Sequence, residues 1–191
     1  GGLWKTLVSF DNLHEAARRA ALGKRKRSDV AAFLLEGELE LVRLRQELES
    51  GAYRPGPYRQ FRVEDPKPRL ISAAPFRDRV VHHALTQVLE PVFERRFSKD
   101  SFACRKGFGT HRALARAKEA ASRFPYVLKC DIRKYFPSID HRILGELLAR
   151  AVKCRGTLGL AALIIEGSNS QEEVIQYFPA DDLFTPYERR R

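Results

Sequence analysis

A single carboxylate, Asp131, stands at the end of a short apolar run and is the strongest candidate for chemistry in this chain. The run, residues 126–132, is rich in residues that favour β-structure, which predicts a buried strand rather than a helix. Pro137 breaks the chain soon afterwards, and Ser138 is placed to cap a helix from about Ile139. A carboxylate buried at a strand end needs a positive partner, usually a divalent cation bound through oxygen. Asp131 is therefore predicted to hold a metal ion, and the alternative is an aspartate that merely caps the turn.

Residues 129–141 read KCDIRKYFPSIDH. This run resembles the first catalytic motif of reverse transcriptases of the bacterial retroelement type, which include group II intron, retron and diversity-generating retroelement enzymes. The resemblance implies that Asp131 binds two magnesium ions and that the backbone carbonyl of Ile132 binds one of them. Two-metal phosphoryl transfer needs more carboxylates than one, and in the family these come from a later Tyr-x-Asp-Asp hairpin.

A hairpin is predicted upstream of this motif. Residues 58–64 alternate as a half-buried strand should, residues 65–68 read DPKP and form a turn, and residues 69–73 return as a second strand. Lys67 and Arg69 lie at and beside its tip, where their charges suit phosphate oxygens. The segment resembles the fingers motif of the same family.

Five residues are implied by the resemblance to bind the incoming nucleotide. Lys67 and Arg69 would hold its triphosphate, as would the backbone amides of Lys134 and Tyr135. Phe136 would pack against its sugar and exclude a 2′-hydroxyl.

A third match covers residues 101–114, a loop with two glycines and basic and aromatic side chains. The loop leads into a helix predicted to be capped by Thr110. The small and apolar side chains of that helix are expected to face inward: Ala113, Leu114, Ala117 and Ala120. Contacts with the nucleic-acid backbone are predicted for four cations: Arg105, Lys106, Arg112 and Arg116.

The remaining pattern is helical. A helix over residues 14–22 is predicted after a cap at Asp11 or Asn12. The basic run at residues 24–27 is equally compatible with a solvated turn and with an RNA contact. One helix from Ser28 or Asp29 carries a core stripe: Val30, Phe33, Leu34, Leu41, Leu44 and Leu48. Another helix, from Phe76, buries a second stripe: Val80, Val81, Ala84, Leu85, Val88 and Leu89.

Charge is concentrated in the middle of the chain. The net charge is +11, and residues 51–130, with 17 basic and 7 acidic side chains, supply +10 of it. Such a field is expected of a surface that binds phosphates, and the alternative is a basic protein tuned for solubility. The three cysteines fit neither a disulfide framework nor a zinc site, and no apolar run could span a bilayer. A reducing, bacterial cytoplasmic setting without a membrane partner is expected.

Together these features predict an α/β (α+β) fold: a helical N-terminal extension (1–57), a fingers subdomain (58–125) and the start of a palm (126–191). The implied function is RNA-directed DNA polymerisation with two Mg²⁺ ions, an RNA template, a DNA primer and dNTPs. A retroelement-encoded RNA or an accessory protein is a further expected partner. Because the sequence contains no Tyr-x-Asp-Asp hairpin, the chain alone is expected to be inactive. The alternative is a non-catalytic basic RNA-binding module.

Overall fold

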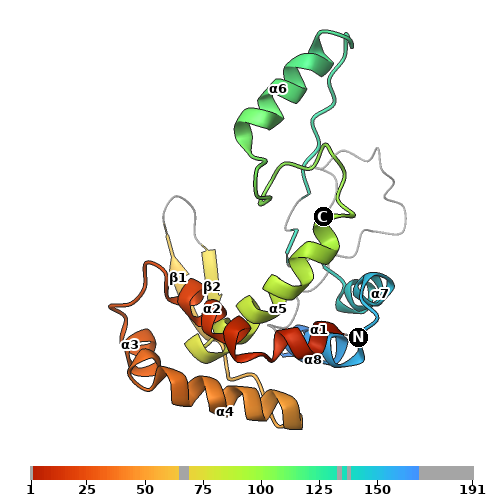
Figure 1. The fold of residues 1–191 in the computed structure, drawn as a ribbon. Helices are drawn as coiled ribbons and strands as arrows, with labels where there is room; N and C mark the ends of the chain where they lie inside the picture. The colour runs from red at the N-terminus through yellow and green to blue at the C-terminus, as the bar shows by residue number, and fades with distance from the viewer. Residues whose placement is uncertain (1, 65–68, 133–134, 137–138, 168–191) are drawn as a thin grey trace, which may run out of the picture.

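The structure, a computed structural model, describes residues 2–64, 69–132, 135–136 and 139–167. Within them the chain is helix-rich and has one two-stranded antiparallel sheet, an α+β arrangement (Figure 1). The elements are α1 (Gly2–Leu7), α2 (Phe10–Ala21), α3 (Ser28–Leu35), α4 (Gly37–Ser50), β1 (Arg59–Val63), β2 (Arg69–Ala73), α5 (Phe76–Glu94), α6 (Thr110–Ala121), α7 (His141–Ala151) and α8 (Arg155–Glu166).

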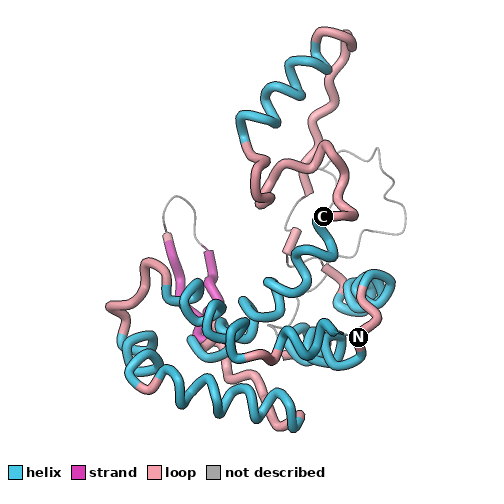
Figure 2. Tube along the Cα trace, in the orientation of Figure 1, coloured by secondary structure: helices cyan, strands magenta, loops and turns pink. Residues whose placement is uncertain are grey.

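The core lies where α2 packs along α5, with α1, α4 and α8 around this pair (Figure 2). The stripe predicted on α5 is confirmed, because Val80, Val81 and Ala84 are fully buried. Leu7 of α1 and Leu160 of α8 join the same cluster. The core therefore draws on all three predicted segments, and their division into subdomains stays a prediction.

The contact between α1 and α8 is especially close. A Cβ atom added to Gly156 would lie 2.7 Å from Cδ2 of Trp4, which is shorter than a normal carbon–carbon contact. Trp4 is thus a packing residue. The helix around it was not predicted.

The start of α2 differs from the prediction. Ser9 is the N-cap, and its hydroxyl accepts a hydrogen bond from the backbone N–H of Asn12 at 3.3 Å. The amide of Asn12 donates instead to the carbonyls of Leu7 (2.9 Å) and Ala84 (3.2 Å). Asn12 therefore joins α1, α2 and α5, and a helix cap is not its role.

The single helix predicted from Ser28 is two helices. The backbone leaves helical geometry at Glu36 (φ −106°, ψ 24°), and α4 begins at Gly37, a residue with low helix propensity. Five members of the predicted stripe are buried, but Leu34 is 39% exposed because α3 and α4 no longer share one face.

The predicted hairpin is confirmed. β1 and β2 pair antiparallel, with Arg59 opposite Ala73 and Val63 opposite Arg69. Its predicted half-burial is wrong, since every residue of β1 is exposed. The hairpin therefore projects from the helical body, as Figure 1 shows.

The segment from α6 to the start of α7 departs furthest from the predictions. α6 has no buried residue, and Leu114 is 62% exposed, so the expected inward face is wrong. Gly109, at φ +121°, occupies the predicted cap position of Thr110. Residues 126–132 form no strand and are exposed, because a strand needs a paired neighbour and no described strand lies beside them.

Asp140 caps α7, and its carboxylate accepts from the N–H of Ile143 at 3.0 Å. This hydrogen bond lowers the pKa of Asp140. The helix starts at His141 rather than near Ile139, and the predicted cap, Ser138, lies outside the described residues. No helix in the described parts of the chain is long and apolar enough to cross a membrane.

Candidate functional site

The carboxylate of Asp131 faces solvent on the irregular segment that precedes α7. Ile132 beside it is 64% exposed. Among the described residues no hydrogen bond or ion pair engages Asp131, and no group of three His, Cys, Asp or Glu residues is placed to hold a metal. The position therefore offers one accessible carboxylate and one neighbouring carbonyl to a cation.

Two aromatic rings follow Asp131. The centroids of Tyr135 and Phe136 lie 5.3 Å apart with the rings edge to face, and Phe136 is 82% exposed. An exposed phenylalanine can pack against a planar or apolar group of a ligand. Of the other predicted nucleotide contacts, Lys67 and Lys134 lie outside the described residues, and the structure describes Arg69 only as backbone in β2.

The base of the hairpin is fixed by a buried carboxylate that the sequence did not reveal. Asp78, 3% exposed, accepts one hydrogen bond from the hydroxyl of Tyr53 and one from the backbone N–H of Gly56, both at 2.8 Å. Burial, followed by the hydrogen bond to Asp78, raises the pKa of Tyr53. The segment that enters β1 is thus tied to the first turn of α5, the helix that β2 enters.

Gly56 is needed at this junction. A Cβ atom there would lie 3.1 Å from Cγ of Pro75 and 3.3 Å from Oδ2 of Asp78. The Asp78 carboxylate therefore fits against bare backbone. An aspartate near a helix start is common for electrostatic reasons, so its spacing from Tyr53 gave no signal of this contact.

Arg105 is the centre of the loop between α5 and α6. Its side chain, 7% exposed, forms an ion pair with Glu94 (2.6 Å) and donates to the carbonyls of Ser98 (2.7 Å) and Ser101 (2.8 Å). Its guanidinium carbon also lies 3.9 Å from the ring centroid of Phe108. This geometry favours internal support of the loop, and the predicted nucleic-acid contact of Arg105 stays a prediction.

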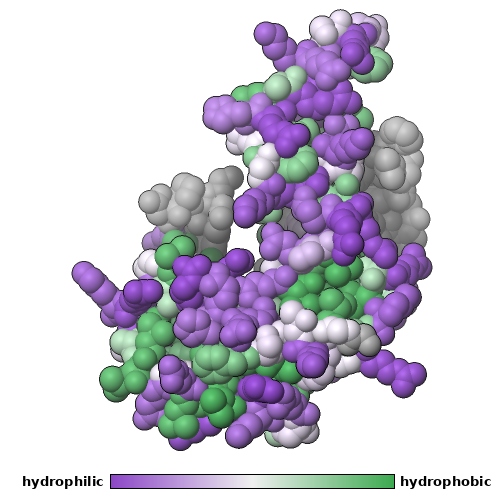
Figure 3. Space-filling view, viewed as in Figure 1, coloured by the Kyte–Doolittle hydropathy of each residue, from purple (hydrophilic) through white to green (hydrophobic). Residues whose placement is uncertain are grey.

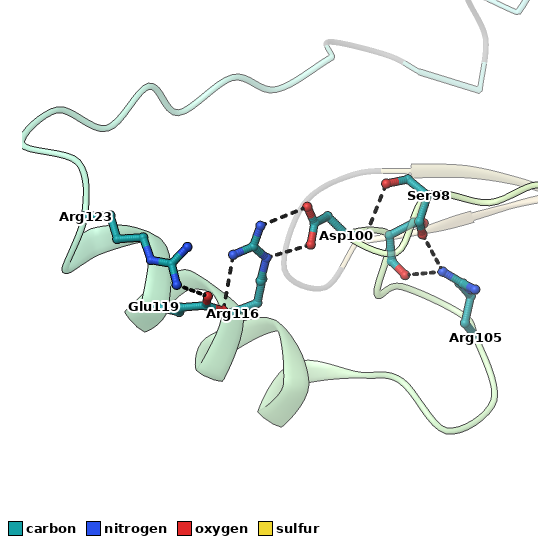
Figure 4. Close-up of polar contacts among 7 residues, drawn as sticks. Ser98, Asp100, Arg105, Arg116, Glu119 and Arg123 are labelled. Carbon is teal, nitrogen blue, oxygen red and sulfur yellow. Dashed lines mark hydrogen bonds and ion pairs between the residues drawn. The ribbon is translucent and has the colours of Figure 1, made fainter.

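The arginines of α6 also have internal partners. Arg116 bonds Asp100 at 2.8 Å and Glu119 at 3.2 Å, as Figure 4 shows. The Arg116 hydrogen bond lowers the pKa of Asp100. Arg112 donates to the carbonyl of Gly107 at 2.8 Å and lies over Phe108.

Lys106 differs from these three arginines. It is exposed, and among the described residues it has no hydrogen bond or ion pair. Of the four predicted nucleic-acid cations, Lys106 is the one whose charge is not paired with any described residue.

A second group of cations gathers around His83 of α5. Burial lowers the pKa of His83, and the charges of Lys24, Arg19 and Arg79 lower it further. Arg79 also bonds Asp29 of α3 at 3.0 Å. The basic turn at residues 24–27 thus lies beside the first half of α5, the end of the helix that β2 enters.

No protein-family model matches the chain. Protein YkfC of Escherichia coli is 31% identical over 121 residues, which are 60% of this chain and 32% of that protein. Nuclear intron maturase 1 of Arabidopsis thaliana is 34% identical over 85 residues, 44% of this chain and 12% of that protein. Group II intron-encoded protein LtrA of Lactococcus lactis is 26% identical over 149 residues, 76% and 24% respectively.

This chain therefore spans about a third of these relatives at most. Putative intron proteins of Saccharomyces cerevisiae match over part of the chain as well. The predicted resemblance is confirmed at the level of the family: the homologues of this chain are group II intron-encoded proteins and intron maturases.

Proposed function

We propose that this chain carries the nucleotide-gripping fingers and the first metal-binding motif of an RNA-directed DNA polymerase. The observation that supports this proposal most is that two features occur together in this chain, which is similar to intron-encoded proteins. One is the motif around Asp131, and the other is the projecting hairpin at the position where the fingers motif was predicted. The reaction is template-directed transfer of a nucleotide to a primer.

The oxygen donors at Asp131 suit magnesium. Mg²⁺ usually takes one or two protein carboxylates and completes its octahedral shell with water and substrate phosphates. The exposed carboxylate of Asp131 and the carbonyl of Ile132 would supply the protein ligands in this part of the chain. When bound, the ions would offset the negative charge of the transferred phosphate.

The remaining roles belong to the protein. Lys67 and Arg69 bind the triphosphate from the hairpin, and the backbone amides of Lys134 and Tyr135 bind it from the palm side. Phe136 packs against the sugar and leaves no space for a 2′-hydroxyl.

The test compares two aspartates of the complete protein. Asp131→Asn removes the charge of the ligand and should abolish primer extension while RNA affinity stays nearly unchanged. Asp140→Asn is the matched control, because asparagine is as good an N-cap as aspartate and α7 should persist. Undiminished synthesis by Asp131→Asn would exclude the proposed role of this residue.

A second candidate function, RNA binding without catalysis, is favoured by the cations around His83. Lys24→Glu/Lys26→Glu should weaken binding to an RNA hairpin and reduce the slope of log affinity against log salt by roughly one per lost phosphate contact. Lys5→Glu/Lys153→Glu, the control, changes the net charge equally at two exposed lysines elsewhere, one in α1 and one in the connection between α7 and α8.

Fluorescence anisotropy at several salt concentrations measures both double variants. Equal losses would mean that only net charge matters and would remove the basic turn as a binding surface. The comparison of Asp131→Asn with Asp140→Asn then separates the two functions, because a protein that only binds RNA has no primer extension to lose.

A further inference from the structure

A hollow of about 670 Å³ lies between α2, α3 and α4 and is bordered by exposed leucines. Leu35 is 87% exposed and Leu39 is 50% exposed. The space-filling view shows hydrophobic residues gathered over α3 and α4 (Figure 3). Contiguous exposed apolar surface of this kind usually marks an interaction site.

The exposed leucines lie on both sides of the break between α3 and α4. Phe33 and Leu41 turn inward and are at most 8% exposed, while Leu35 and Leu39, on either side of Glu36, face solvent. Helical spacing places Leu35 and Leu39 on the face opposite Phe33 and Leu41, so their exposure does not depend on the break. Leu35 therefore protrudes beside a hollow that can receive an apolar side chain.

The rim of the hollow carries opposite charges on its two sides. Arg18 and Arg25 lie on the side of α2, and Glu36 and Glu38 lie at the junction of α3 and α4. Arg18 is bonded to Glu15, and Glu36 lies 3.6 Å from Arg43.

Among the described residues Arg25 and Glu38 have no hydrogen bond or ion pair, and both are exposed. In a two-fold symmetric contact each residue pair occurs twice with the roles exchanged. A surface with one basic and one acidic side is thus complementary to itself, whereas an RNA backbone would be repelled by the acidic side.

We propose that this face binds a second copy of the chain. In the symmetric contact, Leu35 of each copy enters the hollow of the other, and Arg25 of each copy meets Glu38 of the other. The inference does not depend on the proposed function, and its failure would leave that function untouched.

Sedimentation equilibrium of the 191-residue chain over a range of concentrations tests the contact. We expect a monomer–dimer equilibrium that Leu35→Glu weakens by at least about tenfold, because it places a charge in a desolvated apolar site. Leu114→Glu, the same change at a leucine that is 62% exposed on α6, should leave the equilibrium unchanged. Far-UV circular dichroism checks that both variants fold.

Charge exchange tests the pairing. Arg25→Glu and Glu38→Arg should each weaken the dimer, and the chain carrying both changes should recover it, since each copy then again meets an opposite charge. A chain that stays monomeric at every concentration would overturn the proposal. Equal effects of the two leucine variants, or no recovery in the folded double variant, would overturn it as well.

Discussion

Tyr53→Phe should destabilise the chain by about 1.5–3 kcal/mol, the range for hydrogen bonds to charged groups. The change removes only the hydroxyl that donates to Oδ1 of Asp78 at 2.8 Å. Both residues are at most 3% exposed, so water cannot easily replace the lost donor. Tyr126→Phe is the matched control, because Tyr126 is 89% exposed and loss of its hydroxyl should cost less than about 0.5 kcal/mol.

Urea unfolding followed by far-UV circular dichroism measures both variants, with equal denaturant slopes as a check that the unfolded state is unchanged. A double-mutant cycle with Asp78→Asn makes the test specific. The amide of asparagine can accept from Gly56 and donate to Tyr53, so Tyr53→Phe should cost only about 0.5–1.5 kcal/mol in that background. A loss no larger than that of Tyr126→Phe would refute the argument that Asp78 holds the base of the hairpin.

Two further predictions concern packing and pH. Gly156→Ala should leave the chain about 1–3 kcal/mol less stable than Gly159→Ala in the same helix, because only the first methyl meets Trp4; similar unfolding midpoints would contradict this. Burial lowers the pKa of His82, so on acidification the unfolded chain takes up a proton at a higher pH than the folded chain does. The free energy of unfolding should therefore decrease as the pH is lowered from about 7 to about 5. His82→Gln should reduce this dependence in pH-scanned urea unfolding and His111→Gln, at an exposed site, should not; equal curves would reject the assignment.

Features that depend on neighbouring residues were predictable from the sequence. The hairpin follows from two β-favouring runs around a Pro-rich turn, and the buried face of α5 follows from helical spacing. The break at Glu36 was missed because a glycine at position 37 costs only about 1 kcal/mol in a helix, which pattern alone cannot weigh against packing.

Features that depend on distant residues were not predictable. The apolar run at residues 126–132 has the composition of a strand, yet a strand exists only when its backbone groups find partners. The cations of the loop before α6 looked available because the partner of Arg105, Glu94, lies eleven positions away, on the other side of an irregular segment. The residue type therefore gives the charge of a side chain, but the surrounding sequence does not show whether a distant acidic residue already pairs with it.

The lack of buried residues in α6 has a consequence for proteolysis. Trypsin sites in and beside this helix, at Arg112, Arg116, Lys118 and Arg123, are all exposed, and the segment that follows is exposed as well. α7 packs on α8 and α8 packs on α1, so the parts before and after the cut touch independently of the connection. A chain cut once by trypsin in or beside α6 should migrate as two peptides in a denaturing gel. In native buffer the two peptides should stay together as one particle.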